Sequence, residues 1–97
     1  MPVSDSTPLI YMAKLGKLRL LKEIFARVQM PPEVKTETVD RGKARGYADA
    51  ITIEQALSEG WLFADSLTRE NIKRSETLAQ MTGVDIGEAQ AMILAIQ

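Results

Sequence analysis

The chain has 97 residues, and 12 basic against 13 acidic side chains leave a formal net charge of -1. This length supports one small domain, and the balanced charge excludes a general positive field for nucleic acid, so any phosphate binding must be local. Cysteine and histidine are both absent, which excludes disulfides, thiolate or imidazole metal ligands and the usual serine or cysteine triads.

The first predicted elements are a short strand and a helix. The strand is expected around Val3, and a turn follows it at residues 5–7. Thr7 is expected to cap the helix, with Pro8 in its first position, where no amide hydrogen is needed. Gly16 is expected to end it. The apolar stripe of this helix consists of Leu9, Ile10, Met12, Ala13 and Leu15.

A second amphipathic helix is predicted directly after Gly16. Its apolar side chains are Leu18, Leu20, Leu21, Ile24 and Phe25. We expect these first two helices to pack into the core. The alternation of polar and apolar residues at 27–30 predicts a short strand, which ends at Pro31 because proline cannot donate a hydrogen bond to a sheet.

The middle of the chain predicts two helices separated by a loop. Residues 33–40 form the first helix, with Val34 and Val39 available for burial. Residues 41–46 are the most basic stretch of the sequence and have the composition of a mobile loop. The second helix is expected over residues 48–59.

The last third of the chain predicts a buried strand and two further helices. The strand covers residues 61–63, whose aromatic side chains are expected in the core. Thr68 is expected to cap a polar helix that runs to Thr82 and ends at Gly83. Asp85 is expected to open the final helix. The predicted apolar face of that helix consists of Ala89, Met92, Ile93 and Ile96.

No apolar stretch approaches the roughly 20 residues that are needed to cross a bilayer. The N-terminal residues have neither a basic leader nor the apolar core of a signal peptide. We therefore expect a cytoplasmic protein without membrane contact.

An acidic residue and two hydroxyls, at Asp5, Ser6 and Thr7, follow the first predicted strand. In open α/β sheets, ligands bind outside the carboxyl ends of the strands, and a helix N-terminus favours anions. This position therefore suits a metal ion or a phosphate. An alternative is a purely local role, because aspartate and serine often hydrogen-bond to their own backbone in turns.

Several segments occur in an order that resembles the PIN-domain superfamily. They are residues 3–10 (VSDSTPLI), 15–21 (LGKLRLL), 31–37 (PPEVKTE), 56–61 (ALSEGW) and 85–91 (DIGEAQA). The resemblance implies a three-layer α/β/α fold around a short parallel sheet, formed by residues 1–97 as a single domain. In that family a further strand follows the last helix and carries the final acidic ligand. The fold is therefore expected to be incomplete at its C-terminus.

The same resemblance implies a ribonuclease that uses Mg²⁺ or Mn²⁺ bound by carboxylates, often as the toxin of a toxin–antitoxin pair. Asp5 matches the first acidic ligand, Glu37 the second and Glu88 the acidic residue of the last segment. These three are the candidate catalytic and metal-binding residues. Hard cations prefer oxygen ligands, and a metal-activated water needs no histidine. Relatives often have another acidic residue at the position of Gln90.

Each carboxylate also has a simpler interpretation. Glu37 is alternatively a solvated helical residue, and Glu88 is alternatively part of a capping box with Asp85. The structure is expected to distinguish these roles by whether the side chains converge.

RNA is the expected substrate, and the candidate contacts to it are Ser6, Arg41, Lys43 and Arg45. Ser6 would hold a phosphate oxygen or a metal-bound water, and the basic residues would contact phosphates. A solvated loop explains the basic residues equally well. The alternative function is a non-catalytic module, in which an exposed apolar helix at residues 89–96 pairs with a second copy, forming a homo-oligomer, or with an antitoxin protein.

Overall fold

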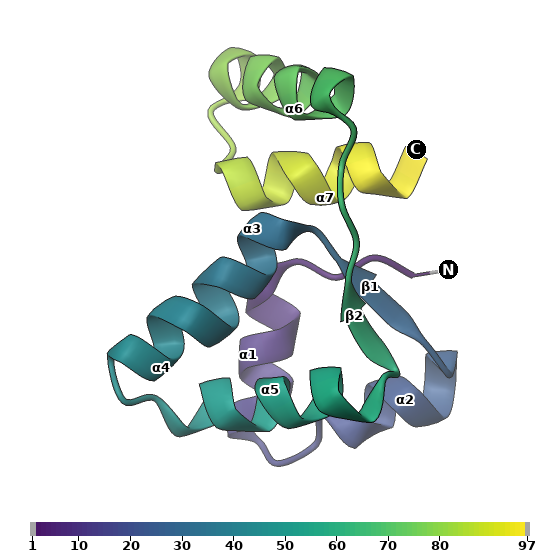
Figure 1. The fold of residues 1–97 in the computed structure, drawn as a ribbon, viewed down its shortest axis with the longest axis vertical. Helices are drawn as coiled ribbons and strands as arrows, with labels where there is room; N and C mark the ends of the chain where they lie inside the picture. Colours follow the sequence, from purple (N-terminus) through teal and green to yellow (C-terminus); the bar gives the residue numbers. More distant parts are fainter. Residues whose placement is uncertain (1, 97) are drawn as a thin grey trace.

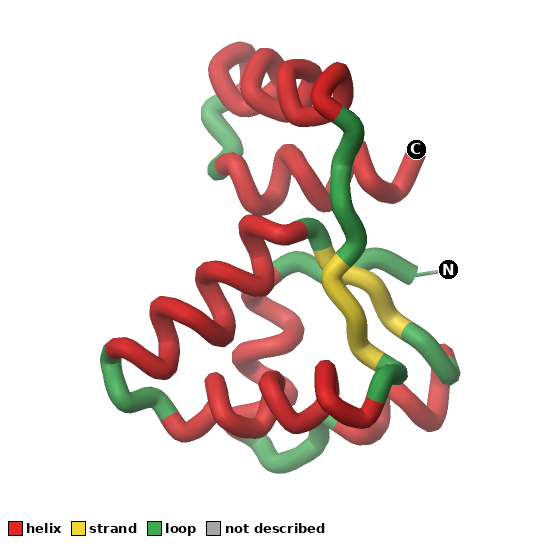
Figure 2. The backbone as a smooth tube through the Cα atoms, in the orientation of Figure 1, coloured by secondary structure: helices red, strands yellow, loops and turns green. Residues whose placement is uncertain are grey.

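Two short strands of the computed structural model lie side by side and parallel (Figure 1, Figure 2), and the N-terminal segment runs beside one of them through a single bridge. β1 (Val28–Met30) and β2 (Leu62–Ala64) form a two-stranded parallel sheet in which Val28 lies opposite Leu62. Val3 joins the other side of β1 through a parallel bridge to Gln29. The structure describes residues 2–96, and these residues confirm the predicted α/β fold with a short parallel sheet.

Helices connect the strands and follow them, so that most of the described chain is helical. In chain order they are α1 (Ser6–Lys14), α2 (Arg19–Phe25), α3 (Pro32–Lys35), the π-helix η1 (Thr36–Arg41), α4 (Gly42–Ala44), α5 (Ala48–Glu59), α6 (Arg69–Thr82) and α7 (Ile86–Ile96). The segments α3, η1 and α4 follow one another without a break. α1 packs against α5, which also contacts η1 and β2.

The hydrophobic core is formed by residues of the strands and of the helices α1, α3, η1 and α5. Its buried members are Leu9, Ala13, Leu18, Val28, Met30, Val34, Val39, Ile53, Ala56, Trp61 and Leu62. The predicted burial of Val34 and Val39 is confirmed. Because both flank Glu37 in the chain, their packing fixes the part of the helix that carries this carboxylate.

The first helix begins earlier than predicted. Its cap is Asp5 and not Thr7, because the Asp5 Oδ1 accepts a hydrogen bond of 2.6 Å from the backbone amide of Ser6. Pro8 is therefore the third residue of the helix, where it is tolerated because the first amides of a helix have no partner within it. The earlier start places the Asp5 side chain at the helix N-terminus.

The second helix forms, but only part of its predicted apolar stripe packs into the core. Leu18, just before its first turn, is buried, and Leu21 packs against the core while partly exposed. No residue of α2 itself is buried, and Ile24 is 69% exposed. The amphipathic pattern therefore identified the helix but not how much of its apolar face is covered.

The prediction of a mobile loop at residues 41–46 is also wrong. The helix continues through η1 into α4, and Gly42 is buried where a Cβ atom would lie 2.8 Å from the Cβ of Ala50. Glycine within a helix costs about 1 kcal/mol relative to alanine. At this position the close approach of α4 to α5 requires it, so Gly42 acts as a packing residue and not as a helix breaker.

α6 and α7 form a helical hairpin that is joined to β2 by an extended connection at residues 65–68 (Figure 1, Figure 2). Thr68 caps α6 by accepting a hydrogen bond from the Asn71 amide, and Gly83 ends α6 with a φ of 78°, both as predicted. α7 packs against α3. No helix within residues 2–96 has the length and apolar composition that would let it span a bilayer.

The apolar face predicted for α7 is only partly covered. Ala89 is buried, whereas Met92 and Ile96 are 51% and 81% exposed. Leu94, which was not in the predicted face, is buried instead. α7 therefore buries one side against the rest of the chain and leaves an apolar surface toward its C-terminal end.

Candidate acidic site

Asp5 lies at the carboxyl end of the first parallel segment. The bridge at Val3 and the hydrogen bond of 2.8 Å from the Ser4 amide to the Gln29 carbonyl hold this segment beside β1. Asp5 then caps α1 through one carboxylate oxygen, Oδ1. Its second oxygen has no hydrogen-bond partner among the described residues. The alternative of a local hydrogen bond from Asp5 to its own backbone is therefore realised as a cap, and it coexists with a second carboxylate oxygen without a partner at the strand end.

Ser6 links the carboxylates of Asp5 and Glu37. Its hydroxyl donates a hydrogen bond of 2.5 Å to the Oε2 of Glu37, across two elements that are far apart in the sequence. Ser6 is only 5% exposed. Glu37 belongs to the first turn of the π-helix η1 and points toward the N-terminus of α1. Its interpretation as a freely solvated helical glutamate does not describe this arrangement.

The π-helix helps to explain how Glu37 faces inward. The neighbouring residues Thr38 and Val39 are both buried, and the Thr38 hydroxyl donates to the Val34 carbonyl within the helix. Single π-helical turns are rare in proteins, but where they occur within an α-helix they often lie at functional sites. The sequence carried no signal for this turn.

Glu88 reaches the same region from α7. Glu88 and Asp5 both line an open cleft of about 320 Å³ whose remaining walls are Val3 and small or apolar residues of α7. The Glu88 backbone amide donates a hydrogen bond of 2.9 Å to the Asp85 Oδ1. The described residues contain no return bond from the Glu88 carboxylate, so only half of the capping box forms and this carboxylate remains available.

Asp85 is a further carboxylate that the sequence interpretation treated only as a helix cap. It lies next to Gly87, where a Cβ atom would be 3.3 Å from the Asp85 Oδ1 and 3.7 Å from the Glu37 Oε2. Gly87 is therefore the point at which α7 meets Glu37. In the sequence, the glycine two positions after Asp85 could have indicated this close approach, because only glycine leaves room where a helix backbone lies directly against another element.

The acidic residues are neighbours, but they do not form a complete metal cage. Within residues 2–96, no group of three or more acidic side chains is arranged to hold one ion. Asp5 and Glu37 are linked through Ser6, and Asp5 shares a cleft with Glu88. These oxygen donors fit a hard cation, because Mg²⁺ is usually held by one or two carboxylates together with waters and substrate phosphates.

The basic candidates lie farther along the same helical run. Arg41 pairs with Glu33 at 3.3 Å and Lys43 with Glu54 at 2.7 Å, and all four side chains are partly exposed. The hydrogen bond from Lys43 to Glu54, with the charge of that carboxylate, raises the pKa of Lys43. Arg45 is exposed at the end of α4.

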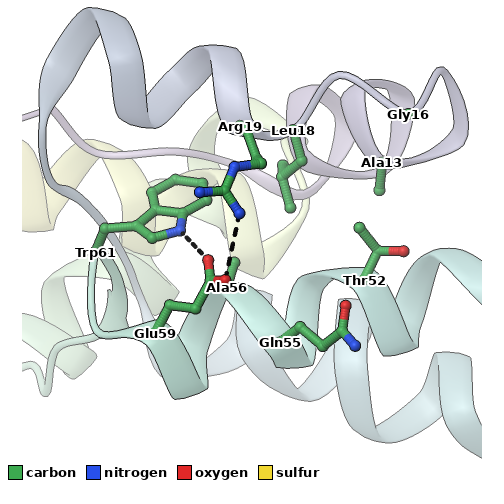
Figure 3. A pocket seen from close by; sticks show the side chains of 9 residues that line it. All are labelled: Ala13, Gly16, Leu18, Arg19, Thr52, Gln55, Ala56, Glu59 and Trp61. Carbon is green, nitrogen blue, oxygen red and sulfur yellow. Dashed lines mark hydrogen bonds and ion pairs between the residues drawn. The ribbon is translucent and has the colours of Figure 1, made fainter.

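A second cleft lies between the α1–α2 region and α5, with Trp61 in its wall (Figure 3). Glu59 accepts a hydrogen bond of 3.0 Å from the Trp61 indole and pairs with Arg19 at 3.4 Å. Trp61 is 4% exposed, as expected for a core residue. This cleft holds none of the candidate ligands, and the contacts of Glu59 tie α2 to α5.

The comparisons with known proteins give one match. The sequence profile of a protein family described as "PIN domain" matches residues 1–97. No curated protein and no solved structure is significantly similar to the chain.

Proposed function

Because the chain belongs to the PIN-domain family, we propose that it is a metal-dependent ribonuclease of the cytoplasm that hydrolyses RNA phosphodiesters. The observation that carries this proposal is the link from Asp5 through Ser6 to Glu37 at the carboxyl end of a parallel strand. Glu88, on the cleft that Asp5 lines, is the third proposed ligand. The proposed cofactor is Mg²⁺ or Mn²⁺, since the donors are all oxygens.

The residues of the chain have distinct proposed roles. Asp5 and Glu37 supply negative charge on neighbouring elements, and the Ser6 hydroxyl holds the Glu37 carboxylate in place. Ser6 is thus a positioning residue, because its hydroxyl hydrogen is directed to Glu37. A bound divalent cation would supply Lewis acidity toward a phosphodiester and a lowered pKa for a water molecule. In the absence of histidine, carboxylates are the available proton acceptors for that water.

RNA is the proposed substrate, and the basic side chains on η1 and α4 are its proposed phosphate contacts. Arg41 and Lys43 keep an exposed surface despite their ion pairs, and such surface pairs are worth at most about 1 kcal/mol. Phosphates could therefore compete for these cations. Together with Arg45 they would bind RNA without reading its sequence. A role as the toxin of a toxin–antitoxin pair is part of this proposal.

Calorimetric titration of Mg²⁺ and of Mn²⁺ into the protein tests the acidic site. The Asp5→Asn variant should bind the cation at least about tenfold more weakly, because it loses a ligand charge while asparagine still caps α1. The matched control is Asp49→Asn on α5, which should bind as the unaltered protein does. Absence of saturable binding in the unaltered protein would refute the proposed metal site.

A second candidate function is an interaction module, and the exposed end of α7 favours it. Met92 and Ile96 leave apolar surface in solvent, as does Met81 at the end of α6, which is 80% exposed. Such surface often marks a protein interface. We propose that it pairs with a second copy of the chain or with an antitoxin protein; Ala89 is buried within the chain and would not contribute.

Light scattering of the purified protein checks this pairing. A homo-oligomer should become monomeric in a Met92→Lys, Ile96→Lys double variant, because two lysines cannot be buried unpaired in an apolar interface. A Glu76→Lys variant at an exposed position of α6 is the control and should leave the mass unchanged. If the unaltered protein is monomeric, self-association is refuted and only pairing with an antitoxin protein remains of this proposal.

A further inference from the structure

An aromatic side chain of α2 is open to solvent near the start of the chain. No residue of α2 is buried, and Phe25, at its C-terminal end, is 48% exposed. Phe25 is neither a member of the core cluster nor one of the partly buried side chains packed against it. Its ring therefore contributes little to the fold and leaves a flat aromatic surface available for stacking.

Phe25 forms one wall of an open cleft of about 330 Å³. The other walls are the N-terminal segment, Pro8 of α1, Leu21 of α2 and the buried Val28 of β1. Most of these side chains are apolar, and pockets for small ligands usually have volumes of about 300–1,000 Å³. The cleft therefore suits a flat and largely apolar group, such as a nucleobase.

Asp5 joins this cleft to the proposed metal site. It lines the cleft together with Phe25, and it also lines the cleft that it shares with Glu88. A base and its phosphate are joined through a single ribose. A phosphodiester bound at the Asp5 carboxylate would therefore have a base within reach of Phe25.

The open side of the N-terminal segment offers a hydrogen-bond donor beside an acceptor. The Gln29 amide donates to the Pro2 carbonyl at 3.0 Å, and the Ser4 amide donates to the Gln29 carbonyl at 2.8 Å. In this parallel register, the amide and the carbonyl of Val3 face away from β1. Neither group has a backbone hydrogen-bond partner among residues 2–96. A nucleobase carries donors and acceptors side by side on its edge, so it can satisfy both groups.

The charge around α2 favours a nucleic acid over other ligands. Residues 14–27 carry five basic side chains and one acidic one, in a chain whose net charge is -1. Lys22 and Arg27 are next in sequence to the cleft residues Leu21 and Val28. Both are exposed, and neither belongs to an ion pair found within residues 2–96. Such cations bind backbone phosphates, whereas an extended peptide paired with the open edge would not need them.

From these observations we infer that the cleft between the N-terminal segment and α2 binds one base of a single-stranded RNA. The base stacks on Phe25, its edge hydrogen-bonds to the Val3 backbone, and Lys22 and Arg27 contact the flanking phosphates. The inference rests on the proposed function and adds to it a base-binding subsite beside Asp5. Because every base has a face that can stack, the subsite positions the RNA and gives little preference for its sequence.

Fluorescence anisotropy of a labelled uridine decamer, measured without Mg²⁺ to prevent cleavage, tests the stacking contact. Phe25→Ala should bind the decamer about 5- to 100-fold more weakly, the usual effect of removing one stacked aromatic ring. Phe25→Trp keeps an aromatic face and should bind at least as tightly as the unaltered protein. Phe25→Leu keeps only apolar bulk and should bind as weakly as Phe25→Ala.

The matched control is Ile24→Ala, with circular dichroism to check that every variant folds. Ile24 is the neighbouring residue on α2, is 69% exposed and does not line the cleft. Its truncation removes exposed apolar surface from the same helix, so this variant should bind the decamer as the unaltered protein does.

An abasic decamer, which has the sugar and phosphate backbone but no bases, separates stacking from phosphate contacts. Phe25→Ala should not change the binding of this ligand, because it has no base to stack. Lys22→Gln should weaken the binding of both decamers to the same extent, since it removes a phosphate contact. An equal loss on both decamers in Phe25→Ala would overturn the stacking role of Phe25.

The remaining outcomes separate this inference from the proposed function. If Phe25→Ala binds the uridine decamer normally while the protein cleaves RNA with Mg²⁺, the subsite is refuted, the ribonuclease stands, and the open edge at Val3 is left to a protein strand. If the unaltered protein neither binds the decamer nor cleaves RNA, both are refuted. Phe25-dependent binding of the uridine decamer alone supports the subsite, even where cleavage is absent and the ribonuclease proposal fails.

Discussion

Glu37→Gln should lower Mg²⁺-dependent RNA cleavage by at least about 100-fold without unfolding the protein. The amide oxygen of glutamine can still accept the hydrogen bond from Ser6, so the link between α1 and η1 survives. The negative charge that would hold a cation is lost, and even partners one step removed from a metal alter activity by about 10–100-fold. Cleavage of a labelled RNA at saturating Mg²⁺, with circular dichroism to check folding, measures the effect.

Two further variants give this experiment its specificity. Glu23→Gln removes an equivalent charge from the exposed surface of α2 and should cleave normally. Ser6→Ala keeps Glu37 charged but removes its hydrogen-bond donor, and we expect an intermediate loss of about 10–100-fold, as for other groups that orient a ligand. Normal cleavage by the Glu37→Gln variant would rule out a catalytic role for Glu37.

Leu62→Ala should destabilise the fold by about 2–5 kcal/mol, the usual loss when a buried leucine is truncated and a cavity remains. Leu62 is fully buried in β2 and belongs to the central core cluster. Because domains of this size are stable by only about 5–15 kcal/mol in total, the variant would lose a large part of its stability. Urea unfolding followed through the fluorescence of Trp61 measures the difference.

Leu15→Ala is the matched control for this prediction. It removes the same atoms from a leucine that is 63% exposed at the end of α1, and its stability should change by no more than about 0.5 kcal/mol. Equal losses in the two variants would contradict the position of Leu62 in the core.

The elements with strong local signals were predicted from the sequence nearly to the residue. α5 covers residues 48–59 as expected, and α6 has the cap at Thr68 and the stop at Gly83 that the sequence indicates. Caps and left-handed glycines act through neighbouring residues, so a single sequence reveals them. The parallel arrangement of Val3, β1 and β2 came from the family resemblance, because three-residue strands carry too little pattern.

The errors have a common physical origin in contacts between distant parts of the chain. In the sequence, Gly42 lies in a segment with the composition of a loop. In the structure it lies in a helix that packs closely against Ala50 of α5, which explains the glycine. The exposure of Ile24 in α2 depends on which helices cover it, and periodicity does not encode that. Local patterns give the type of an element, whereas tertiary packing decides its extent and its burial.

The candidate site was predictable as a set of residue types but not as an arrangement. Asp5, Glu37 and Glu88 were chosen by their matches to a family, and their metal-binding and catalytic roles stay predictions. The hydrogen bond between Ser6 and Glu37 depends on the packing of α1 against η1, and the position of Gly87 near Glu37 and Val34 depends on the packing of α7 against α3. No spacing within a single segment could have revealed them.

The parallel pairing also determines when the acidic residues can meet during synthesis. Val3 pairs with Gln29, and β1 in turn pairs with β2, so each contact joins segments that are made at different times. Asp5 leaves the ribosome among the first residues, whereas Asp85 and Glu88 follow only after almost all the described chain. A nascent chain therefore cannot bring these carboxylates together before residues 85–88 have left the ribosome, so the proposed nuclease site would stay incomplete on every shorter nascent chain.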